Sequence, residues 1–199
     1  MSITALTNTL PKDAGDGLGT ARLFLRRFTK ADLPTLQRLN SDADVMRHLG
    51  GVMSPKKTAA ILNDRILRYY DEHPGMGAWA TVRRDNGECI GFHLLNQVQG
   101  ESLIQIGYRL FPASWGQGYA TEMSRALVHY GYASLGLPVL TANAALDNLA
   151  SQHVLLKLGL RRSGERVFNH PAYAGIGPVA FFERDAASWL AEFSMTTYQ

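Results

Sequence analysis

The sequence predicts a single mixed α/β (α+β) domain, and two patterns in it support this prediction. Apolar and polar residues alternate over several short runs, which is typical of strands. Between those runs apolar residues recur every three or four positions, which is typical of helices. A chain of 199 residues is long enough for one substantial core and short for two. We find no internal repeat and no linker that would divide it.

Four extended runs and two helix starts follow one another in the first half. The predicted elements are a strand from Arg22, helices that begin near Thr29 and Ser54, and strands over residues 78–82, 89–95 and 102–111. The second helix is expected to bury Leu62, Ile66 and Tyr69 on one face. Asp85-Asn86-Gly87 indicates a hairpin between two of the strands, since Asn and Gly accept the positive φ angles of tight turns.

The second half alternates helical and extended segments. The predicted elements are a helix from Tyr119, a strand over 139–144, a helix capped by Asp147 or Asn148 and ended by Gly159, a strand over 179–183, and a helix over 186–193. These elements define a domain over residues 21–195. Residues 1–20 show little periodicity, so we expect them to form a loose arm.

Composition and charge narrow the class of protein. Cys89 is the only cysteine, which excludes a disulfide framework and favours a reducing compartment. The apolar runs are far shorter than the roughly 20 residues that cross a bilayer, and the N-terminus has no signal-peptide pattern. We therefore expect a cytoplasmic protein without a membrane partner. The net charge of +3 comes from scattered basic residues, so we expect no nucleic-acid partner.

The segment Trp115–Glu122, WGQGYATE, lies between a predicted strand and a predicted helix. Gly116 and Gly118 allow a sharp turn and a close approach to a ligand. The first amides of a helix lack partners within it, and together with the helix dipole they suit a pyrophosphate. A plain glycine turn is the alternative. A Walker loop would need Gly-Lys-Ser/Thr, and a dinucleotide fingerprint a third glycine, and the segment has neither.

Five short motifs, taken in order, resemble the GNAT acetyltransferases. They are Gly91-Phe92, Ile106-Gly107-Tyr108, the loop at 115–122, Asn148-Leu149-Ala150-Ser151 and Lys157-Leu158-Gly159-Leu160. The sequence resembles most the Rim-type branch, typified by ribosomal-protein N-terminal acetyltransferases, in which Trp commonly begins the loop. The resemblance implies the GNAT fold: a central mixed, mostly antiparallel sheet flanked by helices, with a splayed strand pair that holds acyl-CoA.

The resemblance also implies which residues bind acetyl-CoA. The loop residues that would meet the pyrophosphate are Trp115, Gly116, Gln117, Gly118, Tyr119, Ala120 and Thr121. The strand end at Leu110 and Phe111 would pair its backbone with the pantetheine arm, and Asn148 would bond that arm from the opposite wall. Ser151 would lie near the thioester sulfur, where its hydroxyl can protonate the departing thiolate. Helix capping is the alternative role of Asn148 and Ser151, and both roles can coexist.

Two departures from the family pattern leave the proton transfers open. Leu155 stands where many relatives have a tyrosine that protonates the thiolate, which shifts that role to Ser151 or water. Gln105 stands where the branch often has Glu, and an amide cannot act as a base. An ammonium group must lose a proton before it attacks. The candidate bases are His93, His170 and Glu183, each with a structural role as its alternative. No metal-ligand spacing is present, so no metal is expected.

The sequence therefore predicts an acetyl-CoA-dependent N-acetyltransferase. A primary amine, on a protein N-terminus or a small molecule, would attack the thioester directly in a ternary complex. A non-catalytic acyl-CoA-binding sensor is one alternative, because the family's Glu and Tyr are missing. A nucleotide-binding protein is another. Dimers are common in the family, so a homodimer is one state that the resemblance allows.

Overall fold

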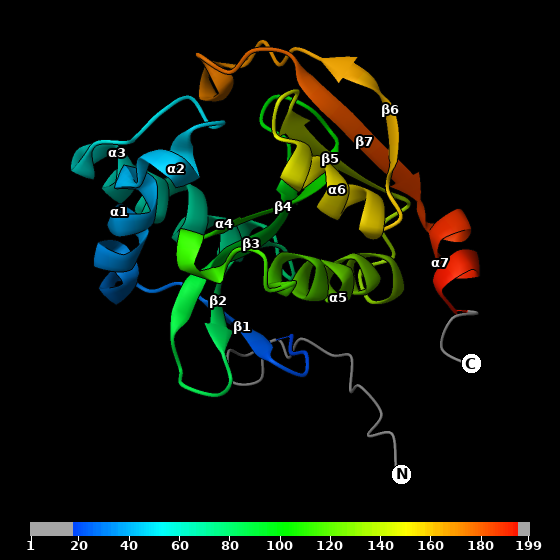
Figure 1. The fold of residues 1–199 in the computed structure, drawn as a ribbon, viewed down its shortest axis with the longest axis horizontal. Helices are drawn as coiled ribbons and strands as arrows, with labels where there is room; N and C mark the ends of the chain where they lie inside the picture. The colour runs from blue at the N-terminus through cyan, green and yellow to red at the C-terminus, as the bar shows by residue number, and fades with distance from the viewer. Residues whose placement is uncertain (1–17, 195–199) are drawn as a thin grey trace.

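A seven-stranded sheet runs through the computed structural model, which describes residues 18–194 (Figure 1). The strands lie in the order β1-β2-β3-β4-β5-β7-β6. They are β1 Leu23–Arg27, β2 Gly77–Arg83, β3 Cys89–Gln97, β4 Ile104–Leu110, β5 Val139–Ala145, β6 Arg161–Arg166 and β7 Val179–Asp185. Every neighbouring pair is antiparallel except β4 and β5, which are parallel. The predicted mixed, mostly antiparallel sheet is confirmed.

Helices flank this sheet. They are α1 Leu33–Ser41, α2 Ala43–Met46, α3 Pro55–Ala60, α4 Arg68–Glu72, α5 Tyr119–Ala133, α6 Leu149–Lys157 and α7 Ala186–Ser194. On β4, Arg109 reaches Asn40 of α1, whereas Tyr108 reaches Ser151 of α6. Successive strand residues point to opposite faces of a sheet. Gln105 therefore lies on the same face of β4 as Arg109, which we call the α1 face, and Tyr108 lies on the other, which we call the α6 face.

The helix predicted after Ser54 is interrupted. A π-helical segment, Ile61–Leu67, separates α3 from α4. Leu62 and Ile66 are buried as expected, but the next buried side chain is Tyr70, and Tyr69 is only half-buried. The Tyr70 hydroxyl donates to the carbonyl of Ala78 and accepts from the amide of Phe28 at 3.0 Å. The prediction of Tyr69 on the buried face is therefore wrong by one residue.

Strand β6 has no counterpart among the placed predictions, and neither has the short helix α2. The sequence of β6, RRSGER, contains no apolar residue, and five of its six residues are exposed. It lies at the edge of the sheet, paired only with β7. Periodicity reports which face of a strand is buried, so an exposed edge strand leaves no such signal.

The end of the expected N-terminal arm packs against the domain. Residues 1–17 lie outside the described residues, but Leu18 is buried and Gly19 bridges to Phe24. The Thr20 hydroxyl donates to Glu122 of α5 at 2.6 Å, and the Arg22 guanidinium donates to the same carboxylate at 2.6 Å. Residues 18–22 therefore attach to the first turn of α5.

Candidate active site

Strands β4 and β5 diverge after a single point of backbone pairing. That pairing joins Gln105 to Thr141, and the Thr141 hydroxyl also donates to the Ile104 carbonyl at 3.0 Å. The described strands continue to Leu110 and Ala145 without further pairing between them. The backbone groups on these facing edges are therefore available to a ligand that lies between the strands.

The alternating direction of backbone groups along β4 shows which of its amides face this gap. The Phe111 amide donates to the Ile90 carbonyl on the β3 side, at 2.9 Å. Because backbone groups of successive residues point to opposite sides of a strand, the groups of Tyr108 and Leu110 face β5. The Leu110 carbonyl accepts from the Trp115 indole at 2.8 Å. Of the expected pantetheine-binding residues, Leu110 thus presents its amide to the gap, and the Phe111 amide is already bonded.

The glycine loop connects the end of β4 to α5. Gly116 and Gly118 have φ angles of +71° and +79°, a conformation that other residues rarely adopt. Gly118 is the N-cap of α5, and the Glu122 amide is bonded to its carbonyl at 3.0 Å. The amides of Tyr119, Ala120 and Thr121 precede that bond, so they have no carbonyl partner within the helix. Three amides at the start of a 15-residue helix form a site suited to an anion.

Asn148 and Ser151 occupy the first turn of α6. The Asn148 side chain accepts from the Ser151 amide at 3.1 Å, so Asn148, of the two predicted caps, is the N-cap. The Tyr108 hydroxyl lies 3.4 Å from the Ser151 hydroxyl and donates to it. Burial raises the pKa of Tyr108, although the Ser151 hydroxyl partly opposes this shift. The phenol therefore keeps its proton at neutral pH, and two hydroxyls meet at this place.

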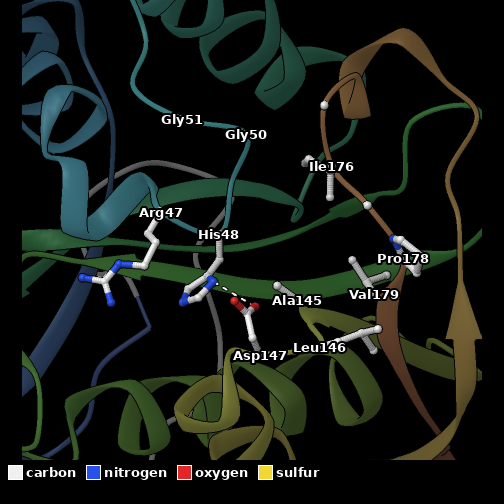
Figure 2. A pocket seen from close by; sticks show the side chains of 12 residues that line it. Arg47, His48, Gly50, Gly51, Ala145, Leu146, Asp147, Ile176, Pro178 and Val179 are labelled. Atoms are coloured by element: carbon white, nitrogen blue, oxygen red, sulfur yellow. Dashed lines mark ion pairs between the residues drawn. The ribbon is translucent and has the colours of Figure 1, made fainter.

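A cavity of about 460 Å³ opens beside the carboxyl end of β5 (Figure 2). Three separate segments form its walls: the loop after α2, the β5–α6 turn and the segment before β7. Its described lining consists of Arg47, His48, Gly50, Gly51, Ala145, Leu146, Asp147, Gly175, Ile176, Gly177, Pro178 and Val179. His48 and Asp147 meet with 3.1 Å between Nδ1 and Oδ1. His48 belongs to no motif, so the sequence alone carries no signal for its place in this cavity.

Residues 22–161 match the family model described as acetyltransferase (GNAT) domain. The chain belongs to the GNAT acetyltransferase family. A relative from Bacillus subtilis, named "Uncharacterized N-acetyltransferase YoaA", is 34% identical over 151 residues, which are 74% of this chain and 84% of that protein. The predictions of a GNAT family member and of an acyltransferase are confirmed. The narrower resemblance to the Rim-type branch stays a prediction.

Solved structures share the fold of this GNAT chain. An acetyltransferase from Agrobacterium tumefaciens gives a TM-score of 0.73 at 23% identity and covers 92% of this chain and 99% of its own. A spermidine N-acetyltransferase from Vibrio cholerae, in complex with CoA and spermine, gives a TM-score of 0.68 at 16% identity. The match covers 86% of this chain and 99% of that protein. These likenesses confirm the predicted single-domain GNAT fold.

The three base candidates lie in different surroundings. His93 is fully buried, with Nδ1 at 2.7 Å from the Thr81 hydroxyl, and burial lowers the pKa of His93 to about 3. His170 is exposed and caps a short helical turn by accepting from the Ala172 amide at 3.1 Å. Glu183 is exposed on β7 and lines a second hollow, of about 340 Å³, beside Leu103. The structure does not bring these three residues together.

Neutral amides occupy the α1 face of the sheet where the branch often has Glu. Gln105 donates to Asn96 at 3.2 Å and accepts from Asn143 at 3.1 Å, so a row of amides crosses β3, β4 and β5. Arg109 lies on the same face of β4 and donates to Asn40. Burial lowers the pKa of Arg109 to about 10, which leaves the guanidinium charged at neutral pH. This row therefore contains no group that can take a proton from an ammonium ion.

Two further observations concern the described part of the chain only. No helix within residues 18–194 combines the length and apolar character needed to traverse a bilayer. Within the same residues, no three His, Cys, Asp or Glu side chains are grouped so that they could hold a metal ion.

Proposed function

We propose that this protein transfers an acetyl group from acetyl-CoA to a primary amine on a small molecule or a protein N-terminus, by direct attack in a ternary complex. The observation that carries the proposal is the continuity between the β4–β5 gap and the unpaired amides at the start of α5. An extended thioester arm fits a gap with free backbone edges, and a pyrophosphate fits a helix N-terminus. Acetyl-CoA combines both features.

The residues of the loop would hold the diphosphate. The amides from Gly116 to Thr121 would donate to its oxygens, while the indole of Trp115, fixed by the Leu110 carbonyl, forms the start of the loop. Asn148 would bond the pantetheine arm through its amide nitrogen, because its side-chain oxygen already accepts from Ser151. The side-chain oxygen of Asn148 can thus cap the helix while its side-chain nitrogen binds the ligand.

The reaction needs a nucleophile, an oxyanion site and an acid. The amine nitrogen would attack the thioester carbonyl carbon, and the C–S bond would break as the amide forms. The β4 amides of Tyr108 and Leu110 face the gap, where the Tyr108 amide would stabilise the oxyanion and the Leu110 amide would pair with the pantetheine arm. The Ser151 hydroxyl would give its proton to the thiolate and recover one from Tyr108, which solvent would then reprotonate. No covalent enzyme intermediate is required.

The surroundings of the candidate bases favour structural roles for all three. A group with a pKa near 3, like His93, does not take a proton from an ammonium ion with a pKa near 10. His170 uses Nδ1 for a cap, and Glu183 lies in the second hollow. The amide row at Gln105 also favours a second candidate function, a CoA-binding sensor without catalysis.

One pair of measurements tests the proposal and separates it from the sensor. Acetyl-CoA at about 100 times its Kd should stabilise the protein by roughly 2.7 kcal/mol, whereas ATP or NAD should not. CoA release, followed with a thiol reagent, should rise above background with one acceptor pool among polyamines, amino acids, aminoglycosides and short peptides. The polyamine pool is included because the Vibrio cholerae relative is named for spermidine. Binding without release in any pool would favour the sensor, and no binding would refute both functions.

A further inference from the structure

The turn between β5 and α6 connects the cavity of Figure 2 to the place where the thioester would react. Asp147 lines the cavity, and the next residue, Asn148, caps the helix that carries Ser151. Ala145, at the end of β5, lies on the cavity wall and at the end of the β4–β5 gap. An amine that enters through this cavity therefore arrives at the open end of the splayed strands.

The contact between His48 and Asp147 fixes the orientation of the imidazole. Nδ1 of His48 is 3.1 Å from the Asp147 carboxylate, and Figure 2 shows the two side chains extending toward each other from opposite walls. A carboxylate accepts a hydrogen bond, so Nδ1 carries the proton and Nε2 presents a lone pair. The His48 side chain is 22% exposed and that of Asp147 is 79% exposed, so a ligand in the cavity can reach the pair.

The charges around the pair favour a cationic acceptor at this point. Besides His48, Arg47 and Asp147 are the residues with charged side chains in the described cavity lining. Arg47 forms an ion pair with Asp44, which offsets its charge. The third wall, formed by the segment before β7 with Ile176, Pro178 and Val179, carries no charge. The carboxylate of Asp147 therefore remains to attract an ammonium group.

We propose that His48 is the general base for the acceptor amine and that Asp147 is its positioning residue. This inference rests on the proposed function. Nε2 takes one proton from the ammonium group, which frees the nitrogen lone pair for attack on the thioester carbon. The second proton passes from the nitrogen to solvent as the C–S bond breaks, and it balances the proton that solvent returns to the Tyr108–Ser151 pair after Ser151 has protonated the sulfur. The imidazolium then releases its proton to solvent, so that one amide, one thiol and one proton are formed.

Steady-state kinetics of His48→Ala test this assignment, with the acceptor that gives the highest CoA release and with saturating acetyl-CoA. We expect kcat/KM for the acceptor to fall by about 10²- to 10⁴-fold. The acidic limb of its pH profile should disappear, and added imidazole should restore part of the rate. Asp147→Asn should lower kcat/KM less, because the histidine remains. His153→Ala, an exposed histidine on α6, is the matched control and should leave the kinetics unchanged.

The outcomes separate this inference from the function on which it rests. Stabilisation by acetyl-CoA should be the same in wild type and in His48→Ala. A wild-type kcat/KM in His48→Ala would overturn the assignment. A loss of rate that imidazole does not restore, with the acidic limb unchanged, would also overturn it, because the histidine would then be structural. A wild-type protein that binds acetyl-CoA but acetylates no acceptor would overturn the proposed function, and the inference with it.

Discussion

The hydroxyl of Tyr108 donates a hydrogen bond to the hydroxyl of Ser151 at 3.4 Å, across 43 positions of sequence. Tyr108 comes from β4 and Ser151 from the first turn of α6, so the pair spans the opening between the two walls that would enclose the thioester. Many GNAT relatives carry a tyrosine on the second helix, where this chain has Leu155. The geometry places a phenol beside Ser151 from the strand instead.

Removal of either hydroxyl should slow turnover without weakening donor binding. We expect Ser151→Ala and Tyr108→Phe each to lower kcat by about 10- to 100-fold, toward the low end of the usual effect of general acid catalysis, because one hydroxyl or water remains. The KM for acetyl-CoA and its thermal stabilisation should stay nearly constant. The double variant should lose much less than the product of the single effects, since the two groups act as one unit. Fully multiplicative losses would show that they act independently.

The glycine loop gives a prediction about donor affinity. Gly118→Val places a branched side chain at φ +79° beside the first amides of α5, and should weaken acetyl-CoA binding by tenfold or more. Calorimetric titration with CoA measures the effect directly. Gly136→Val is the matched control, because Gly136 has a φ of +64° and open space around its Cβ position but lies beyond the end of α5. Equal CoA affinity in the two variants would contradict a loop role in binding.

Tyr70 should matter for stability rather than for catalysis. Its hydroxyl is buried between the Ala78 carbonyl and the Phe28 amide, and burial raises the pKa of Tyr70 to about 12. Tyr70→Phe leaves both backbone groups unsatisfied, which should lower the free energy of unfolding by about 1–3 kcal/mol. Urea denaturation measures this loss, and kcat of the folded variant should be unchanged. A stability equal to wild type would mean that water replaces the hydroxyl.

The same tyrosine shows where sequence patterns stop being informative. Leu62 and Ile66 could be predicted as buried, because their spacing is that of a helix face. The next buried residue is Tyr70 rather than Tyr69. Local periodicity allows both, because they stand four and three positions after Ile66, and the hydrogen bonds that hold Tyr70 are tertiary contacts with Ala78 and Phe28. Strand β6 could not be predicted from periodicity, because an edge strand of exposed polar residues shows no alternation of apolar and polar positions.

The candidate site divides in a similar way. The glycine loop and the cap at Asn148 could be predicted, because each is a local motif whose backbone conformation requires particular residue types. The contacts of Tyr108 with Ser151 and of His48 with Asp147 join segments 43 and 99 positions apart. Such pairs depend on how strands and loops meet in space. A short motif therefore predicted the loop that we propose binds the donor, while the residues that would move protons required the structure.

The carboxylate of Glu122 should make the stability of the protein depend on pH. Burial opposes ionisation of Glu122, but hydrogen bonds from Thr20 and Arg22 outweigh it, so the pKa of Glu122 lies below its ordinary value of 4.5. A carboxylate with a lowered pKa in the folded state stabilises the fold above its unfolded pKa, and this stabilisation is lost as pH falls through the folded pKa. Glu122→Gln should therefore lower the Tm at pH 7, and the difference from wild type should shrink as pH falls below 4.5 and vanish below the folded pKa of Glu122. The effect should be small, because Arg22 is 49% exposed and salt screens the pair. Thermal melts of both proteins between pH 3 and 7 measure it, and a Tm difference that persists undiminished at pH 3 would show that packing, rather than charge, attaches residues 18–22 to α5.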